Sequence, residues 1–422
     1  MIQLKGSEAI NYGKLIYHNR VQLNMTQEEL SRGICSISYL SKLENLKVES
    51  SNEEVLELLL ERLNIDLSQL SSGEETERDL ITWYKSIQIR DMISAKKHYS
   101  KLKSFFDSNV FMPELTYWFE IICLRYFALL NDHTEMETKL KKLSKLKKNF
   151  NIKQQIYLNY FTGIYYCKKK NFELGLQYLN QTEKQFKEEN LRDQEIDFHL
   201  ALTYSHLNKV PLAIYHTRIA LEIFNEKSLF HRSIDCQMLI GINMGRVGKF
   251  EEAENQYLNI IGLANQLNDA EILGMVYTNL GCLYQQSKLY SKSINSFLES
   301  LTYKKEHTIN YGNSIYGLVE SHLLNNDIKQ GLVWIEKGLK KISSCDITTK
   351  IKLTKLKMEI KNQLDLATYL EDIAIPYFLE TADYVNLCES YEQLADHFSQ
   401  MFQYKKSSHF YCLSNTIRKT HL

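Results

Sequence analysis

The sequence is poor in the two residues that interrupt helices, with 3 prolines and 16 glycines among 422 residues. Because these residues fit a helix interior least well, their scarcity favours an all-α protein. The 8 cysteines are scattered without a CxxC pair. We therefore expect reduced thiols that act as small core residues, and not a metal or redox centre.

The sequence also lacks a signal-peptide pattern and any apolar run long enough to cross a membrane. Its formal net charge is +0, so no global attraction draws the whole chain toward nucleic acid. From these absences we expect a cytoplasmic protein with no membrane partner.

Motifs of catalysis are missing as well. There is no glycine-rich phosphate loop, no HExxH and no spacing typical of metal ligands. The 12 histidines are dispersed, and no carboxylate or cysteine arrangement supports His397 and His409 as ligands. We expect no enzyme activity, no catalytic residue, no metal and no cofactor.

What the sequence does contain is a repeated pair of small or slender residues, twelve positions apart, between about residues 156 and 345. A polar turn separates the two members, and large residues such as Tyr257 and Phe297 follow the second member by four positions. Small residues let two antiparallel helices close, and large ones fill the gaps around them, which is the tetratricopeptide (TPR) pattern. The pairs are Gly163 and Gly175, Ala201 and Ala213, Gly241 and Ala253, Gly281 and Ser293, and Val319 and Gly331. The step returns at Ala395 and Ser407, so we expect the array to continue to the C-terminal part.

Residues 1 to 70 predict a different structure. Thr26 and Glu29 form a capping box that begins a helix at 27–32, and Gly33 ends that helix. Ser36 caps the next helix, 37–46. Two short helices joined by a turn that contains glycine indicate a helix-turn-helix.

The motif residues resemble the XRE, or lambda-repressor-like, DNA-binding family. They are Arg20, the segment Met25 to Leu30, Gly33-Ile34, Ile37-Ser38 and the segment Leu40 to Asn45. The resemblance implies that Arg20 and Glu44 form a buried structural ion pair. It also implies DNA-binding roles, with phosphate contacts from Gln27 and Asn45 and with a face toward the major groove that comprises Ile37, Ser38, Ser41 and Lys42.

Two features of this head depart from the family. Leu46 stands where the family has a Glu-x-Gly motif, and residues 1–70 hold seven Lys plus Arg against ten Asp plus Glu. Because phosphate neutralisation supplies most of the affinity for DNA, one head should bind weakly, and a two-fold site would need a dimer. The alternative is a helix-turn-helix that serves as a protein-docking bundle.

Residues 71–155 predict a polar linker followed by helices at 77–89, 92–106 and 114–130. Trp83-Tyr84, Tyr117-Trp118 and Arg125-Tyr126 resemble the opening bundle of the Rap phosphatases. Their catalytic glutamine is replaced here by the stretch Met112-Pro113-Glu114. The resemblance therefore implies a docking surface for a response regulator without phosphatase activity. Lysines from 139 to 148 alternate with leucines and predict a solvated helix face.

Asn243 and Asn279 lie on first helices of the repeats, although helix interiors disfavour asparagine. A side-chain amide can pair with both the N–H and the C=O of an extended peptide. From composition alone, asparagines that simply face water are slightly favoured. The segments around them resemble the peptide-binding repeats of the Rap and RNPP families. The resemblance implies that Asn243 and Asn279 hold the peptide backbone and that Arg125 pairs with a carboxylate of the peptide. Asn313, one repeat further on, is a further implied peptide contact.

The whole chain resembles the RNPP family of Gram-positive quorum-sensing receptors, in its longer NprR-type branch. The implied fold is all-α, with an XRE-type helix-turn-helix domain (1–70), a linker and Rap-like bundle (71–155), and a TPR right-handed superhelix (156–422). The implied partners are a short re-imported signalling peptide, a double-stranded DNA operator and further copies of the chain in a homo-oligomer, either a dimer or a tetramer. An aromatic-rich C-terminal end offers a dimer surface. The alternative is a Rap-like module that sequesters a sporulation response regulator.

Overall fold

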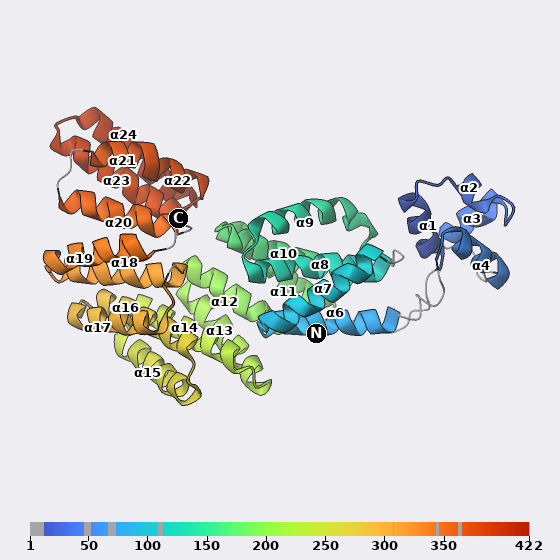
Figure 1. Cartoon of the computed structure of the whole chain (residues 1–422), viewed down its shortest axis with the longest axis horizontal. Helices are drawn as coiled ribbons and strands as arrows, with labels where there is room; N and C mark the ends of the chain where they lie inside the picture. Colours follow the sequence, from blue (N-terminus) through green and yellow to red (C-terminus); the bar gives the residue numbers. More distant parts are fainter. Residues whose placement is uncertain are drawn as a thin grey trace. The chain divides into compact units, whose positions relative to one another are not determined.

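The computed structural model describes residues 12–45, 52–65, 73–108, 113–306, 308–342, 346–361 and 365–421. Most of these residues are helical, and no strand occurs among them, so the predicted all-α fold is confirmed. The chain divides into two compact units, Met1–Lys169 with Glu173–Ile196, and Lys170–Phe172 with Asp197–Leu422 (Figure 1).

The N-terminal head has four described helices, namely α1 (Tyr12–Gln22), α2 (Gln27–Ser31), α3 (Ile37–Glu44) and α4 (Glu53–Arg62). Its core contains Ile16, Leu30, Leu40 and Leu59, each with an exposed fraction of 0%. Because every helix contributes to one small core, the two short helices α2 and α3 are held at a fixed angle. Leu46, which departs from the family pattern, lies outside the described residues.

The predicted helix caps of the head are confirmed. The Thr26 hydroxyl accepts a hydrogen bond from the Glu29 backbone N–H, and the Glu29 carboxylate accepts one from the Thr26 backbone N–H. The Ser36 hydroxyl accepts from the Tyr39 N–H at 3.1 Å. Gly33 has a φ of +77°, a left-handed conformation that costs other residues energy, and it therefore ends α2 sharply.

The rest of the first unit contains α6 (Gly73–Gln88), α7 (Met92–Ser108), α8 (Pro113–Leu130), α9 (His133–Leu146), a short 3-10 turn (Lys147–Asn149), α10 (Ile152–Lys168) and α11 (Phe172–Glu188). Trp83 and Trp118 are both buried, at 0% and 1% exposed. The Trp83 ring lies 5.5 Å from the rings of Phe119 and Tyr126, centroid to centroid. Large aromatic residues thus fill the space between these helices.

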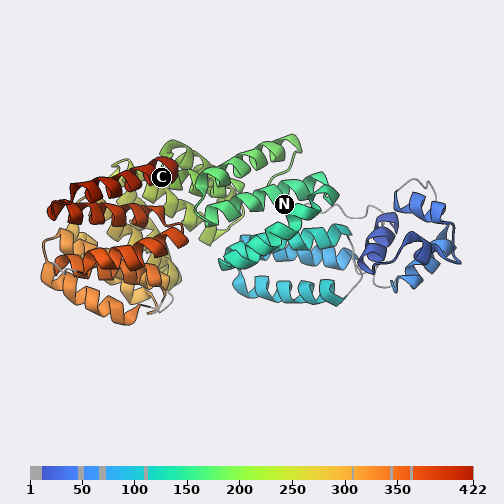
Figure 2. The ribbon, with the colours of Figure 1, turned by 90° about the horizontal axis from the view of Figure 1, so that it is seen from above.

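The second unit is a series of helices connected by short turns (Figures 1 and 2). Its first helices are α12 (Ile196–His206), α13 (Val210–Glu226), α14 (Phe230–Arg246), α15 (Phe250–Leu267), α16 (Ala270–Gln286), α17 (Tyr290–Tyr303), α18 (Ile309–Leu324) and α19 (Ile328–Lys341). Its last are α20 (Ile347–Ile360), α21 (Leu366–Tyr369), a π-helical turn (Leu370–Ala374), α22 (Ile375–Glu380), α23 (Tyr384–Gln400) and α24 (Tyr404–His421). The short helices α21 and α22 and the π-helical turn between them interrupt the regular series of long helices.

Contacts between small and large residues explain why the twelve-residue spacing specifies helix pairs. A Cβ added to Gly281 on α16 would lie 2.9 Å from the Phe297 ring of α17. A Cβ added to Gly241 on α14 would lie 2.6 Å from the Tyr257 ring of α15. Both rings are almost completely buried, at 0% and 1% exposed. Each pair therefore closes because the first helix has no side chain where the ring of the second one packs.

The C-terminal end keeps part of its aromatic surface outside the core. The Phe398 and Phe410 rings stack with centroids 5.6 Å apart, which joins α23 to α24. Phe402 and Tyr404 remain 78% and 63% exposed. The dimer surface at this end stays a prediction. No described helix has the length and apolar composition that a membrane-crossing segment needs.

Candidate functional site

The head contains the ion pair that its family resemblance implies. Arg20 Nε lies 2.6 Å from Glu44 Oε1, and Arg20 Nη2 lies 2.9 Å from Glu44 Oε2. Gln27 Nε2 donates to the same carboxylate at 2.6 Å. Two charge-assisted bonds from one fork-shaped guanidinium fix the angle between α1 and α3. The Gln27 amide is thereby positioned at the start of α2.

The exposed side of α3 carries the residues predicted to face DNA. Leu40 and Leu43 point into the core, whereas Ser38, Lys42 and Asn45 are exposed and Ile37 is 47% exposed. Ser41 is half-buried, and its carbonyl accepts a bond from Asn45 Nδ2 at 2.7 Å. This polar surface, with a single lysine, suits contacts to base edges better than strong phosphate binding.

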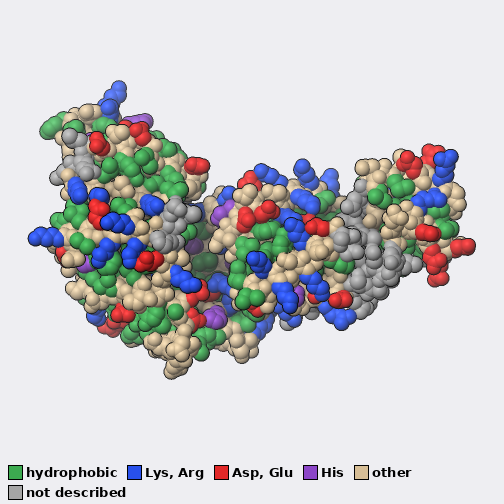
Figure 3. Space-filling model, viewed as in Figure 1, with side chains coloured by type: hydrophobic (Ala, Val, Ile, Leu, Met, Phe, Trp, Pro, Cys, Tyr) green, Lys and Arg blue, Asp and Glu red, His purple; other side chains and the backbone are tan. Residues whose placement is uncertain are grey.

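Acidic side chains gather over α4 of the head (Figure 3). Glu53, Glu54, Glu57 and Glu61 are all exposed on this helix. Such a surface repels phosphates, which disfavours α4 as the helix that approaches DNA. The electrostatics of the head therefore favour α3 as the DNA-contacting element.

Arg125 on α8, to which the family resemblance gives a role toward a peptide carboxylate, is buried in this structure. Its exposed fraction is 4%, and its Nη2 lies 2.9 Å and 3.1 Å from the two carboxylate oxygens of Glu195. Glu195 is itself 0% exposed. The Arg125 guanidinium is thus occupied by an internal carboxylate, because the connection before α12 folds back onto α8.

Asp193 lies beside this pair and is also 0% exposed. It accepts hydrogen bonds from the Tyr84 hydroxyl at 2.8 Å, from Gln88 Nε2 and from the Glu195 backbone N–H at 2.9 Å. Burial, and then the charge of Glu195, raise the pKa of Asp193. We call Tyr84, Gln88, Arg125, Asp193 and Glu195 the Asp193 cluster. Tyr84 and Asp193 are 109 residues apart, so no local pattern in the sequence could have revealed the cluster.

Asn243 on α14 is also placed inside the protein, with an exposed fraction of 0%. Its Nδ2 donates to Ser205 Oγ at 3.0 Å and to the Leu239 carbonyl at 2.8 Å, while its Oδ1 has no hydrogen-bond partner. Arg246 Nη1 donates to Ser205 Oγ as well, at 2.8 Å. In this conformation Asn243 joins α14 to α12 and presents no surface to a ligand.

Asn279 and Asn313 are the two predicted peptide contacts whose side chains are accessible. Asn279 on α16 is half-buried, and its Nδ2 lies 3.7 Å from Met238 Sδ, a weak acceptor. Asn313 on α18 is exposed. These two amides lie on first helices of successive pairs and keep capacity for hydrogen bonds to a ligand backbone.

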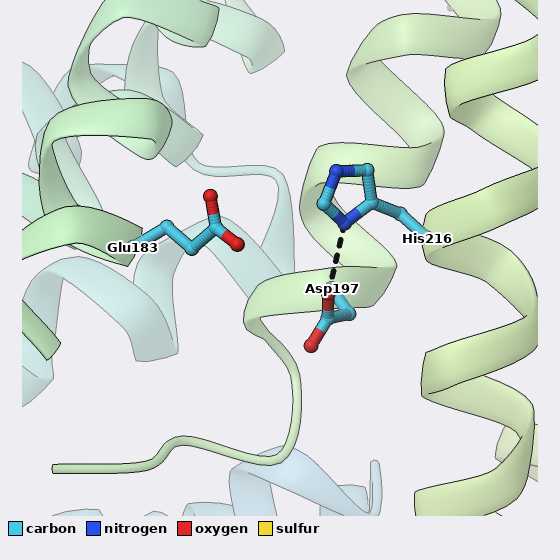
Figure 4. Close-up of side chains that lie close together, drawn as sticks. All are labelled: Glu183, Asp197 and His216. Atoms are coloured by element: carbon cyan, nitrogen blue, oxygen red, sulfur yellow. Dashed lines mark hydrogen bonds and ion pairs between the residues drawn. The ribbon is translucent and has the colours of Figure 1, made fainter. Parts of the chain in front are cut away.

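A further polar pair lies at the start of the second unit. His216 Nδ1 on α13 is 2.8 Å from Asp197 Oδ1 on α12 (Figure 4). The His216 ring also stacks on Tyr204, with centroids 5.4 Å apart. The pair therefore joins the two helices, a role that the sequence analysis did not predict.

Comparisons with known proteins agree with this arrangement. The helix-turn-helix family model HTH_3 matches residues 16–70. The transcriptional activator NprA of Geobacillus stearothermophilus is 31% identical over 404 residues, which cover 92% of this chain and 99% of NprA. The regulatory protein RapC of Bacillus subtilis is 24% identical over 228 residues, which cover 50% of this chain and 59% of RapC.

Solved structures of the same kind are similar in fold. The apo form of the quorum sensor NprR from B. thuringiensis has a TM-score of 0.64 at 25% identity, covering 82% of this chain and 99% of that one. NprR in complex with its cognate peptide NprX gives a TM-score of 0.63, also at 25% identity, with 82% and 99% coverage. A Rap protein complexed with competence and sporulation factor gives 0.66 at 18% identity, with 83% and 99% coverage.

Proposed function

The chain belongs to the RNPP family of regulators and is of the NprR type, and from this premise we propose that it is a transcription regulator switched by a short peptide. The observation that carries the proposal is the similarity to a transcriptional activator over 92% of the chain, from the head through the helix pairs. Such a regulator needs a head that reads DNA and a second part whose ligand changes what the head does.

The head would read DNA through α3. Ile37, Ser38 and Lys42 would meet base edges, and Gln27, positioned by Glu44, would contact a phosphate from the start of α2. Asn45 and Ser41 complete this surface. Because the head has few basic residues, two heads would be needed for useful affinity, which makes the assembly of copies the natural point of control.

The peptide would lie against the first helices of the second unit, where Asn279 and Asn313 are accessible. Their amides would hold its backbone, as the family resemblance implies. Asn243 and Arg125 would reach the peptide only in a bound form that opens their internal contacts to Ser205 and Glu195. By linkage, the peptide must bind one assembly of the chain more tightly than the other in order to shift the balance between them.

Selection of duplexes from a random-sequence DNA pool by the full chain, with and without a degenerate library of short peptides, tests this function. We expect peptide to change the retained duplexes, and light scattering to show a change in molecular mass under the same conditions. Identical duplexes and identical mass in both conditions would contradict the switch.

Variants at the proposed peptide contacts sharpen this test. Asn279→Ala and Asn313→Ala should lose the peptide dependence and keep basal DNA binding. Asn265→Ala, an exposed asparagine on the second helix α15, is the matched control and should respond normally. Sequestration of a response regulator is the less favoured alternative, because the relative that spans nearly the whole chain is a transcriptional activator.

A further inference from the structure

Lys304, directly after α17, places its ammonium group between two first helices of the second unit. Its Nζ donates to Thr278 Oγ1 on α16 at 2.5 Å, to Ser314 Oγ on α18 at 2.7 Å and to the Asn310 carbonyl at 3.0 Å. Its stem crosses α16 at Gly274, where an added Cβ would lie 3.0 Å from Lys304 Cγ. The absence of a side chain at Gly274 therefore lets this lysine reach the first-helix layer.

Hydroxyl groups surround the ammonium group, and no carboxylate among the described residues forms an ion pair with it. Ser300 Oγ lies 2.8 Å from Thr278 Oγ1 and 2.9 Å from Ser314 Oγ, which completes a buried cluster of neutral oxygens. Neutral acceptors satisfy the hydrogen bonds of an ammonium but do not neutralise its charge. Burial lowers the pKa of Lys304 to about 8, so most of the group is still charged at pH 7.

A second buried lysine of this unit, Lys355, differs from Lys304 because carboxylates act on its ammonium group. Lys355 on α20 is 4% exposed and donates to Ser390 Oγ at 3.0 Å. Burial lowers the pKa of Lys355 to about 8, and the negative charges of Glu389 and Glu359 act in the opposite direction. Lys355 thus has carboxylates that oppose the effect of burial, whereas the group that does so for Lys304 is the Cys282 thiol, whose own pKa burial raises to about 11.

Thr278 and Ser314, which hold the Lys304 ammonium, are the chain neighbours of Asn279 and Asn313. We propose that Lys304 is an anion subsite that receives a carboxylate of the bound peptide, either its C-terminal carboxylate or an Asp or Glu side chain. This inference rests on the proposed peptide function, and it adds that the bound peptide carries a carboxylate at this position. A carboxylate would replace the exposed contact to the Asn310 carbonyl and keep those to Thr278 and Ser314.

The test uses the immobilised full chain and a degenerate library of short peptides made in two forms, with a free C-terminal carboxylate and with a C-terminal amide. Retained peptides are sequenced by mass spectrometry. The variants are Lys304→Met and Lys304→Gln, which remove the charge, and Lys304→Arg, which keeps it. Lys292→Met is the matched control, since Lys292 lies on α17, the helix that Lys304 directly follows, and already pairs with Glu254 at 3.5 Å.

We expect the unmodified chain to retain the free-acid library at least about tenfold better than the amide, if the C-terminal carboxylate binds Lys304. If a side chain binds there, both forms are retained and Asp or Glu is enriched at one position. Either preference should disappear in Lys304→Met and Lys304→Gln, persist in Lys304→Arg and be unchanged in Lys292→Met.

Retention of both forms without acidic enrichment, or a preference that survives in Lys304→Gln, would overturn the subsite and leave Lys304 as a purely structural residue. Retention of no peptide in either form would contradict the peptide function itself, and the subsite with it. Thermal unfolding of each variant separates these outcomes from misfolding. Lys304→Gln keeps a hydrogen-bonding group, so it still tests the loss of the charge if Lys304→Met does not fold.

Discussion

Arg125 and Glu195 form a buried bidentate ion pair, with Arg125 Nη2 at 2.9 Å and 3.1 Å from the two Glu195 oxygens, although the residues are 70 positions apart. The pair fixes the connection between α11 and α12 to α8. Neither side chain reaches solvent to any extent, since their exposed fractions are 4% and 0%. It is therefore a structural element of the first unit.

Breaking this pair should destabilise the first unit. Glu195→Ala leaves the Arg125 guanidinium buried without its partner, and the expected loss is about 3 kcal/mol of unfolding free energy. Arg125→Met should cost a similar amount, and the double variant Arg125→Met with Glu195→Ala should cost less than the sum of the two single losses. Denaturant unfolding followed by tryptophan fluorescence measures this, because Trp83 and Trp118 are buried in the same unit. Additive losses would show that the pair is not energetically coupled.

Asp193→Asn should have the opposite effect. Burial and the neighbouring Glu195 raise the pKa of Asp193, so its ionised form is disfavoured in the folded protein. At pH 7 the asparagine variant should be more stable than the original chain, because it lacks the disfavoured negative charge. As the pH falls through the raised pKa of Asp193, the carboxylate is protonated and the cost of its buried charge disappears. The original chain should therefore gain stability relative to the asparagine variant. A stability difference that stays constant as the pH falls from 7 toward the ordinary aspartate value of 3.8 would contradict this account.

Glu44→Ala should loosen the head. The change leaves the buried Arg20 guanidinium and the Gln27 amide without their shared acceptor, at a cost of about 3 kcal/mol. Hydrogen exchange of the head amides in the full chain measures the loss. Glu57→Ala, an exposed residue on α4, is the control and should leave exchange almost unchanged. Equal exchange rates in both variants would mean that the pair does not hold the head together.

Gly281→Ala should destabilise the second unit by about 1–3 kcal/mol, because the added methyl would meet the buried Phe297 ring at 2.9 Å. Gly262→Ala makes the same chemical change on α15, where nothing lies within 4 Å of the added Cβ. That variant should gain about 0.5–1 kcal/mol from helix propensity. Thermal unfolding measures the stability change of each variant. If both variants were stabilised, or both destabilised, the close packing of Gly281 against Phe297 would not explain the repeat.

The lowered pKa of Lys304, about 8, predicts a stability that depends on pH. The ammonium is costly to bury, so the penalty is present below pH 8 and fades as the pH rises from about 8 toward the ordinary lysine value of 10.5. Lys304→Met lacks this titration. The melting temperature of the original chain should therefore rise relative to that of Lys304→Met between pH 7 and pH 9.5. A constant difference would indicate that Lys304 is well solvated.

The sequence by itself determined the features that depend on residues close together along the chain. The capping box at Thr26 and Glu29, the turn at Gly33 and the helix pairs around Gly241 and Gly281 all follow from spacings of a few to sixteen residues. The XRE pattern likewise pointed to Arg20 and Glu44 as a pair, which lie at 2.6 Å. Local geometry is enough for the caps and the helix pairs, because a helix fixes which neighbours meet, whereas the Arg20–Glu44 pair, 24 positions apart on two helices, came from the family resemblance.

Tertiary structure alone decided which polar side chains are accessible. Asn243 and Asn279 look equivalent in sequence, yet one is fully buried against Ser205 and the other remains accessible. Arg125 meets Glu195, and Lys304 meets Thr278, across long stretches of chain. Desolvation and hydrogen bonding at such points depend on the packing of distant helices, which periodicity along the sequence does not encode.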